Sequence, residues 1–383
     1  MIKTLIAQTS EVDDEGLAVS EILGQLNIGQ NLKKNSVGIM TCYLDFIENG
    51  IVKAICEQLP FDVAGINTLN SATSGGEGPI ALSLAVLTSD DVFFSAGVSA
   101  PLPRDYKDSI RELYEKTSAK HQDKPSLILA FAPVAQYSTA GDYLVDALDA
   151  ASGGVPVFGM MPSDFTTDFR CPLIIFEGKT YKDSIAVILM SGQVNPKFIR
   201  MTIPEERTLK RKAIVTSSQG NILKEVNGSP ALDYIKSLGL VEDDGLVSTQ
   251  TIPLIVYNED GSEPVARSIY ALTPEGYPIL GGLAPEGCTV GVGVIDHADV
   301  MSMISKMLGS LDECNFLLIA SCMSRNFILG WDNMAEIKLA QSRLGKDVPF
   351  LFVYVAGELC PVHSADGKLV NRFHNLTLIG CAL

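Results

Sequence analysis

The sequence predicts an α+β fold with mixed α/β elements. We expect β-sheets built from repeated strand-helix-strand-hairpin units, covered by helices and arranged in two related halves. Three patterns indicate this class. Short apolar runs bounded by Gly, Pro or Asp are typical of strands buried on both faces. Segments with a 3.6-residue apolar period alternate with them. Turn dipeptides separate the elements, as at Glu177-Gly178, Asn227-Gly228 and Asp260-Gly261.

Three stretches of the chain share one order of elements. Each reads as a strand, a helix, a second strand, a loop, and then a further strand or a hairpin. The expected strands lie at 36–40, 61–65 and 80–87 in the first stretch, at 126–131, 155–159, 173–176 and 184–190 in the second, and at 315–320, 348–355 and 373–379 in the third. This rhythm predicts sheets covered by helices.

Helices are expected where apolar residues recur on one face. Leu144, Leu148 and Ala151 share a face of one segment, and apolar residues share a face of another between Val300 and Leu308. Pro230 follows the turn at Asn227-Gly228 and suits the first turn of a helix, where its missing N–H costs nothing.

The most plausible domain boundary lies between Gly192 and Arg207, a segment with two prolines and clustered charges. We therefore expect one domain at residues 1–200 and a second at residues 201–383. No low-complexity linker separates them, so we expect the two domains to pack tightly together.

Composition excludes several classes of protein. With 46% hydrophobic and 19% charged residues over 383 positions, the chain can bury a large core and is not globally disordered. Its 45 acidic and 29 basic residues give a net charge of −16, which opposes binding to a nucleic-acid backbone. Neither a signal peptide nor an apolar run long enough to span a bilayer is apparent. We expect a cytoplasmic protein without membrane insertion.

Motifs for cofactors and metals are missing as well. The sequence has no phosphate-binding loop, nucleophile elbow or zinc-binding histidine pair, and its four histidines are dispersed. We therefore expect no cofactor and no metal. The eight cysteines form no C-x-x-C pair, so most should be reduced thiols packed as small apolar groups.

Candidate binding residues follow the strands of the third stretch. Cys322 comes just after a buried strand, where ligand crevices form in sheets covered by helices, and Arg325 is close behind it. Cys322 could contact a ligand, act as a nucleophile, or simply fill a tight turn. Glu358 follows the next strand and could accept a ligand amine, pair with Arg325 or remain solvated. His374 and Asn375 begin the last expected strand, where alternation turns at most one of them toward a given pocket unless the strand bends. His374 could equally be a core histidine that is hydrogen-bonded to a backbone carbonyl.

Several motifs in this order resemble those of the FIST family, from about Asn35 to Leu383. The motifs that carry the resemblance are Cys171-Pro-Leu-Ile-Ile-Phe-Glu-Gly-Lys179, Asp183 to Gly192, Gly220 to Tyr234, Gly287-Cys-Thr-Val-Gly-Val-Gly293, Ser321-Cys-Met-Ser-Arg325, Gly357-Glu358 and Phe373-His-Asn-Leu-Thr-Leu378. The resemblance implies a two-part sensory module, FIST N-like over 1–200 and FIST C-like over 201–383. It also implies a small ligand, such as an amino acid or a related metabolite.

The chain departs from the family pattern at two places. Residues 65–71 read Gly-Ile-Asn-Thr-Leu-Asn-Ser where relatives tend to have Gly-Cys-Ser-Thr-Ala-Gly-Glu, which leaves Asn67 and Thr68 as weaker candidates for ligand contacts. Asn326 replaces the glycine of the family's Cys-x-x-Arg-Gly. The C-terminal positions are therefore the stronger candidates. Relatives often carry an attached output domain, and none is visible here, so a signal would pass to a separate partner protein or through the oligomeric state.

The leading interpretation is a non-enzymatic ligand-binding protein with Cys322, Arg325, Glu358, His374 and Asn375 around its pocket. Arg325 would meet a ligand carboxylate and Glu358 an amine, a charge pattern suited to an α-amino acid. Two alternatives stay open. One is a hydrolase or transferase with Cys322 as nucleophile and His374 as base, and the other is a scaffold that docks a partner protein. The sequence leaves the ligand and the oligomeric state open.

Overall fold

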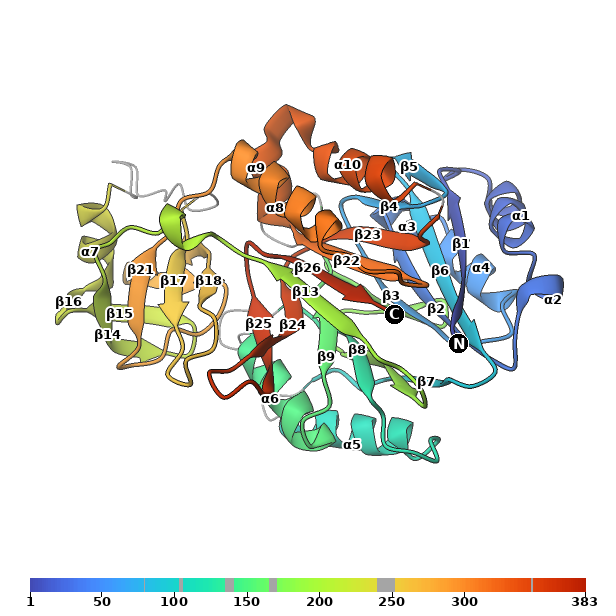
Figure 1. Cartoon of the computed structure of the whole chain (residues 1–383), viewed down its shortest axis with the longest axis horizontal. Coiled ribbons are helices and arrows are strands. Elements are labelled where there is room, and N and C mark those ends of the chain that lie inside the picture. Colours follow the sequence, from blue (N-terminus) through green and yellow to red (C-terminus); the bar gives the residue numbers. More distant parts are fainter. Residues whose placement is uncertain (79, 103–105, 135–140, 165–170, 240–251, 346) are drawn as a thin grey trace.

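The computed structural model confirms the α+β class (Figure 1). It describes residues 1–383 except 79, 103–105, 135–140, 165–170, 240–251 and 346. Within the described residues, three six-stranded sheets form the body of the molecule, and a smaller eight-stranded sheet system lies at one end. In this part of the chain, no helix is both long enough and apolar enough to cross a membrane.

The body consists of three units with one order of elements. The first unit contains β1 (Lys3–Thr9), α1 (Glu15–Leu26), α2 (Ile28–Asn31), β2 (Asn35–Cys42), α3 (Leu44–Glu48), α4 (Ile51–Glu57), β3 (Val63–Asn67), β4 (Ser71–Thr73), β5 (Gly76–Gly78) and β6 (Leu82–Ser89). The second contains β7 (Phe93–Val98), α5 (Tyr106–Ser118), β8 (Leu127–Phe131), α6 (Gly141–Ser152), β9 (Val157–Met160), β10 (Ile174–Phe176), β11 (Lys179–Tyr181) and β12 (Ala186–Ser191).

The third unit is interrupted by the smaller sheet system. It contains β13 (Lys197–Met201), α8 (His297–Gly309), β22 (Leu317–Cys322), α9 (Met323–Leu329), η2 (Gly330–Asp332), α10 (Ala335–Leu344), β23 (Phe350–Val355), β24 (Glu358–His363), β25 (Leu369–His374) and β26 (Leu378–Ala382). The segment inserted after β13, called the insert below, contains η1 (Glu205–Arg207), β14 (Ala213–Gln219), β15 (Ile222–Val226), β16 (Ser229–Pro230), α7 (Ala231–Ser237), β17 (Leu254–Tyr257), β18 (Val265–Arg267), β19 (Ile269–Leu272), β20 (Pro278–Leu280) and β21 (Thr289–Val292).

Each unit pairs two parallel strands, β2 with β3, β8 with β9, and β22 with β23. Helices connect the strands of each pair, as parallel crossovers require. A returning strand (β6, β12 or β26) then pairs antiparallel with the first strand of the parallel pair. The strand that opens the unit (β1, β7 or β13) pairs with the other edge of the returning strand. The resulting sheets are β1-β6-β2-β3-β10-β11, β7-β12-β8-β9-β24-β25 and β13-β26-β22-β23-β4-β5, called the first, second and third sheets below.

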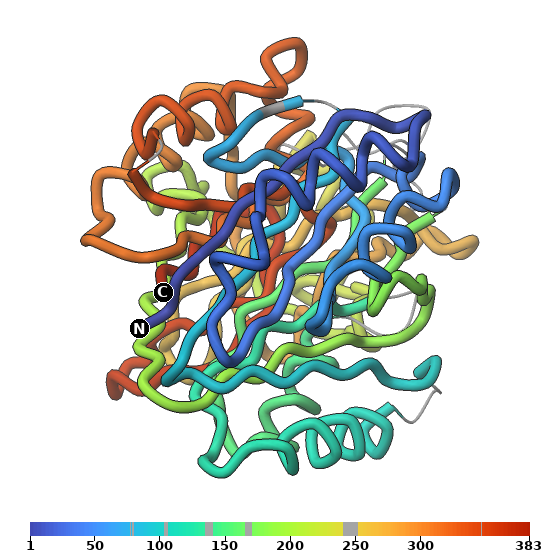
Figure 2. Tube along the Cα trace, turned by 90° about the vertical axis from the view of Figure 1, so that its right-hand side faces the viewer, coloured from blue at the N-terminus to red at the C-terminus, as the bar shows by residue number. Residues whose placement is uncertain are grey.

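The hairpins are exchanged among the units in a ring. The first unit's hairpin β4–β5 joins β23 of the third sheet, the second unit's hairpin β10–β11 joins β3 of the first sheet, and the third unit's hairpin β24–β25 joins β9 of the second sheet. No sheet is therefore completed by its own unit. Both chain termini lie near each other on one side of this body (Figures 1 and 2).

The three sheets pack their inner faces against one another around one central core. Ile39 of β2, Leu129 of β8 and Leu318 of β22 meet in this core, and all three side chains are buried. The outer faces are covered by α1 and α4 on the first sheet, by α5 and α6 on the second, and by α8 and α10 on the third (Figure 1). Each sheet is thus buried on both sides, which accounts for its continuous apolar strands.

The hairpins leave their own units at one junction. The backbone carbonyl of Tyr354 in β23 accepts hydrogen bonds from the hydroxyls of Thr68 (2.6 Å) and Ser163 (2.9 Å), which follow β3 and β9. The N–H of Met161 donates to the carbonyl of Gly357 at 3.0 Å. Hydrogen bonds therefore join all three units at the place where their hairpins cross into neighbouring sheets.

One expected strand is wrong in detail. The sequence predicted a single strand over 373–379, but β25 ends at His374 and β26 begins at Leu378. Leu376 between them has a φ of 53°, in the left-handed region. The chain turns there from the second sheet back to the third, and apolar composition alone cannot reveal that turn.

Close packing of the parallel pairs yields a testable prediction. A Cβ at Gly159 would lie 2.5 Å from the carbonyl oxygen of Ala130, and one at Gly65 would overlap the carbonyl oxygen of Met40. We expect Gly159→Ala to lower the unfolding free energy by about 1–3 kcal/mol, because the backbone must shift to make room. Urea denaturation followed by circular dichroism measures the change.

Gly24→Ala is the control, because nothing lies within 4 Å of a Cβ at this position in α1. A gain of up to about 1 kcal/mol is expected there from helix propensity. Equal stability of Gly159→Ala and the parent would contradict the packing of β8 against β9.

Candidate functional site

The exchange of β24–β25 brings four predicted residues together. Cys322 ends β22, Glu358 begins β24, His374 ends β25, and Asn375 follows it. Glu358 lies directly opposite His374 in the β24–β25 ladder, so their side chains share a face. All four residues, called the polar cluster below, are buried.

Glu358 is the centre of the polar cluster. Its exposed fraction is 0%, and its Oε2 accepts a hydrogen bond from the N–H of Thr377 at 3.3 Å. Its Oε1 has no hydrogen-bond partner among the described residues. Burial raises the pKa of the Glu358 carboxyl well above its usual value, against the opposing effects of hydrogen bonds and of the Arg325 cation. The carboxyl is therefore neutral over a wider pH range than an exposed glutamate.

Cys322 lies beside this carboxyl, and its thiol favours the ionised form of Glu358. Its backbone N–H donates to the carbonyl of Thr377 at 3.0 Å, which ties the end of β22 to the turn before β26. Burial, with a smaller effect of the Glu358 charge, raises the pKa of the thiol. The nucleophilic form of a cysteine is the thiolate, so this environment disfavours nucleophilic chemistry.

His374 and Asn375 add two further acceptors. The Nε2 of His374 lies 2.9 Å from the carbonyl oxygen of Cys360, so Nε2 carries the proton and Nδ1 is an acceptor. Burial, together with the Arg200 cation, lowers the pKa of His374 well below its usual value, which keeps the ring neutral. Asn375 donates its Nδ2 to the carbonyl of His374 at 3.0 Å. Neither His374 Nδ1 nor Asn375 Oδ1 has a partner within the described residues.

Arg325 lies next to the polar cluster but is committed elsewhere. Its Nη2 binds Oε1 of Glu336 at 2.6 Å, and both side chains are fully buried. Its Nε donates to the hydroxyl of Ser321 at 3.1 Å, and its Nη2 also approaches the carbonyl of Val300 at 3.3 Å. The Tyr354 hydroxyl donates to Oε2 of Glu336 at 3.2 Å. The guanidinium thus fastens α8, α9 and α10 to the third sheet.

Asn67 and Thr68 lie at the junction of the three units. The Asn67 side chain donates to the carbonyl of Cys171 at 2.8 Å and accepts from the N–H of Leu173 at 2.7 Å. It thereby holds the chain that enters β10. Thr68 is engaged with the Tyr354 carbonyl. In the described part of the chain, no hydrogen bond joins either side chain to the polar cluster.

Sequence reasoning missed the part of the insert that borders the polar cluster. Arg267 of β18 binds Asp142 of α6 at 2.6 Å and donates to the carbonyl of Phe373 at 3.0 Å. The Asn375 side chain lies so close to Gly281 that a Cβ at Gly281 would overlap it. A lone arginine in an apolar strand is the only sequence signal for this contact.

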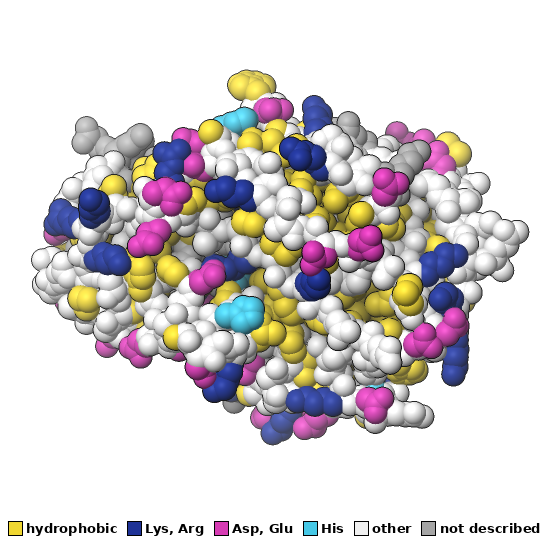
Figure 3. All heavy atoms as spheres, in the orientation of Figure 1, with side chains coloured by type: hydrophobic (Ala, Val, Ile, Leu, Met, Phe, Trp, Pro, Cys, Tyr) yellow, Lys and Arg dark blue, Asp and Glu magenta, His cyan; other side chains and the backbone are white. Residues whose placement is uncertain are grey.

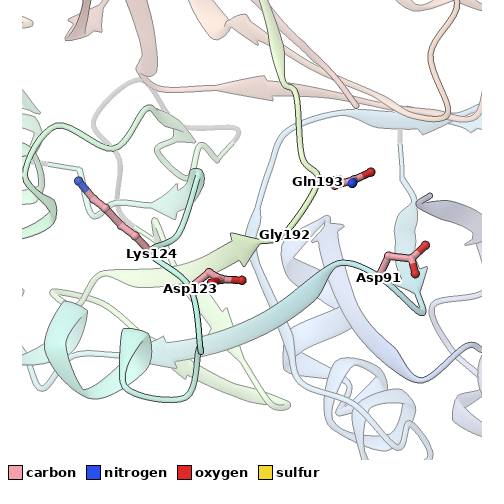
Figure 4. A pocket seen from close by; sticks show the side chains of 5 residues that line it. All are labelled: Asp91, Asp123, Lys124, Gly192 and Gln193. Atoms are coloured by element: carbon pink, nitrogen blue, oxygen red, sulfur yellow. The ribbon is translucent and has the colours of Figure 1, made fainter.

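A surface hollow of about 690 Å³ lies elsewhere (Figure 4). It is lined by Asp91, Asp123, Lys124, Gly192 and Gln193, from turns next to β7, β8 and β12. Asp91 already binds the N-terminal ammonium at 2.9 Å. None of the predicted site residues lines this hollow.

The buried ion pair gives a second prediction. Arg325→Met leaves Glu336 buried without its cation, so we expect a loss of about 3–5 kcal/mol of unfolding free energy. The double variant Arg325→Met/Glu336→Leu removes both charges and should lose less. Arg111→Met breaks an exposed pair with Asp108 and should cost under about 1 kcal/mol. Urea titrations of the parent and the three variants measure these losses of unfolding free energy. A double variant no more stable than Arg325→Met would contradict the account.

The thiol environment gives a third prediction. Iodoacetamide near pH 7 should label Cys322 at least about tenfold more slowly than the half-buried Cys171, because the Cys322 thiol is buried and protonated. Peptide mass spectrometry of the folded protein measures both rates. Faster labelling of Cys322 than of Cys171 would instead favour a nucleophilic cysteine.

Comparison with known proteins confirms the resemblance to one family. A family model described as the FIST N domain matches residues 36–229, and one described as the FIST C domain matches residues 231–361. No curated protein matches the chain. FIST domains are sensory modules of signal transduction that bind small ligands. The two matches cover most of the chain, which therefore belongs to the FIST domain family.

Proposed function

We propose that this protein is a signal-input module that binds an amino acid or a related small metabolite at the polar cluster. The observation that carries the proposal is the set of buried acceptors Glu358 Oε1, His374 Nδ1 and Asn375 Oδ1, which lack partners among the described residues. Buried polar atoms are nearly always hydrogen-bonded, and an unpaired one costs about 1–3 kcal/mol. A ligand that supplies donors removes this cost.

Binding is favoured over catalysis by the same geometry. The Cys322 thiol is buried beside Glu358, and its pKa is raised. A hydrolase would need a thiolate and a nearby base, whereas burial lowers the pKa of His374. Arg325, expected to meet a ligand carboxylate, instead supports the end of β22 through its ion pair with Glu336.

The signal would leave through the insert and reach a separate partner protein. Arg267 and Gly281 contact the backbone and side chains at the end of β25, so a ligand that shifts His374 or Asn375 changes the contact of the insert with the body. In Figure 3, acidic and basic side chains are interspersed on the face shown, without a large basic patch, which supports a small ligand rather than a nucleic acid. All eight cysteines are free, which supports a cytoplasmic location.

A thermal-shift screen with amino acids and related metabolites tests the proposal. A ligand present at ~100 times its dissociation constant should stabilise the protein by about 2.7 kcal/mol. We expect His374→Leu to abolish the shift, because it removes the Nδ1 acceptor and puts an apolar side chain of similar size in its place.

His363→Leu is the matched control, since His363 is an exposed histidine on the same hairpin. It should leave the shift unchanged. A screen without any stabilising compound, or a ligand that stabilises His374→Leu as much as the parent, would refute the proposed site.

A further inference from the structure

We propose that the polar cluster recognises its ligand through an amine, and that a ligand carboxylate is not required. This inference rests on the proposed function and narrows the ligand class. Glu358 Oε1, His374 Nδ1 and Asn375 Oδ1 all accept hydrogen bonds, and a primary ammonium carries three N–H donors.

The placement of Glu358 and His374 suits one shared donor group. The two side chains lie opposite each other on one face of the β24–β25 ladder. This face continues into the central core through Met160 of β9, which pairs with Glu358. An ammonium between the ionised carboxylate and the neutral imidazole can donate to both, whereas an anion could accept only from the O–H of the protonated Glu358 and would face the lone pair of His374 Nδ1.

The nearby arginines are already paired with acidic residues. Arg325 binds Glu336 at 2.6 Å, and Arg267 binds Asp142 at 2.6 Å. Two further pairs join Arg200 to Glu263 and Arg372 to Asp260. Arg200 Nη2 and Arg372 Nε form no hydrogen bond within the described residues, and each is a single donor atom that lacks the two-pronged geometry by which arginine selects carboxylates. A ligand carboxylate that makes a two-pronged contact with one of these arginines would therefore have to displace a protein acid, and an amine would not.

Proton balance follows from the state of Glu358. In the free protein, burial keeps this carboxyl protonated above its usual pKa. When R–NH3⁺ binds, the Glu358 O–H bond breaks, the proton passes to solvent, and the carboxylate accepts an N–H from the ammonium. Binding thus releases about one proton at a pH below the raised pKa. The apparent affinity increases with pH until the free carboxyl ionises.

Matched compounds test this inference on the full chain. Each of the twenty standard amino acids is compared with the amine left by decarboxylation and with the acid left by removal of its amino group, by isothermal titration calorimetry in buffers of different ionisation enthalpy. For the amino acids that bind, we expect the decarboxylated amine to bind within about tenfold and the acid to bind at least 100-fold more weakly. Proton release should accompany amine binding.

Glu358→Gln keeps the side chain's shape and should lose both the amine affinity and the proton release, whereas the exposed Glu112→Gln should keep both. Circular dichroism checks that each variant folds. If Glu358→Gln fails to fold, proton release on amine binding to the parent protein still tests the inference. Binding of the acids with loss of amine binding, or amine binding without proton release, would overturn the inference while leaving the proposed function intact. Absence of binding by every compound would refute both.

Discussion

The carbonyl oxygen of Tyr354 is the point on which the architecture depends. It accepts two hydroxyl hydrogen bonds, from Thr68 of the first unit and Ser163 of the second, while Tyr354 itself belongs to the third. At this place each unit sends its hairpin into a neighbour's sheet. Because no sheet is complete without a strand from another unit, the three units are expected to fold cooperatively, and a change at the junction reaches all three sheets.

The site is a consequence of this exchange. Glu358 and His374 belong to the third unit along the chain but to the second sheet by pairing, whereas Cys322 stays in the third sheet. The polar cluster therefore bridges two sheets at the edge of the central core, where burial raises the pKa of Glu358 and lowers that of His374, which favours the neutral form of each. The insert borders the polar cluster through Gly281. The polar cluster therefore contains buried polar atoms without hydrogen-bond partners among the described residues and also contacts a separate sheet system. This combination suits a sensor.

Much of the fold was predictable, because local pattern specifies local structure. The expected strand at 126–131 corresponds to β8, and the turn at Glu177-Gly178 has the positive φ values of 48° and 74° that such a dipeptide favours. The sheet that each hairpin joins was not predictable, since pairing over long sequence distances leaves no periodic signal. The same limit applies to Arg325, whose partner Glu336 lies on another helix. The position of Arg325 in the sequence suggested a contact with a ligand carboxylate. In the structure, the Arg325 cation is instead paired with Glu336 of the protein.

The central claim is that Glu358 is a neutral acid in the free protein and becomes a carboxylate against a bound amine. A titration of its side-chain carbon by ¹³C NMR, assigned with Glu358→Gln, tests this claim most directly. The account predicts a midpoint well above that of exposed glutamates in the free protein, and a shift to the carboxylate signal at constant pH when an amine ligand is added. A midpoint in the ordinary range that is unaffected by ligand would contradict it.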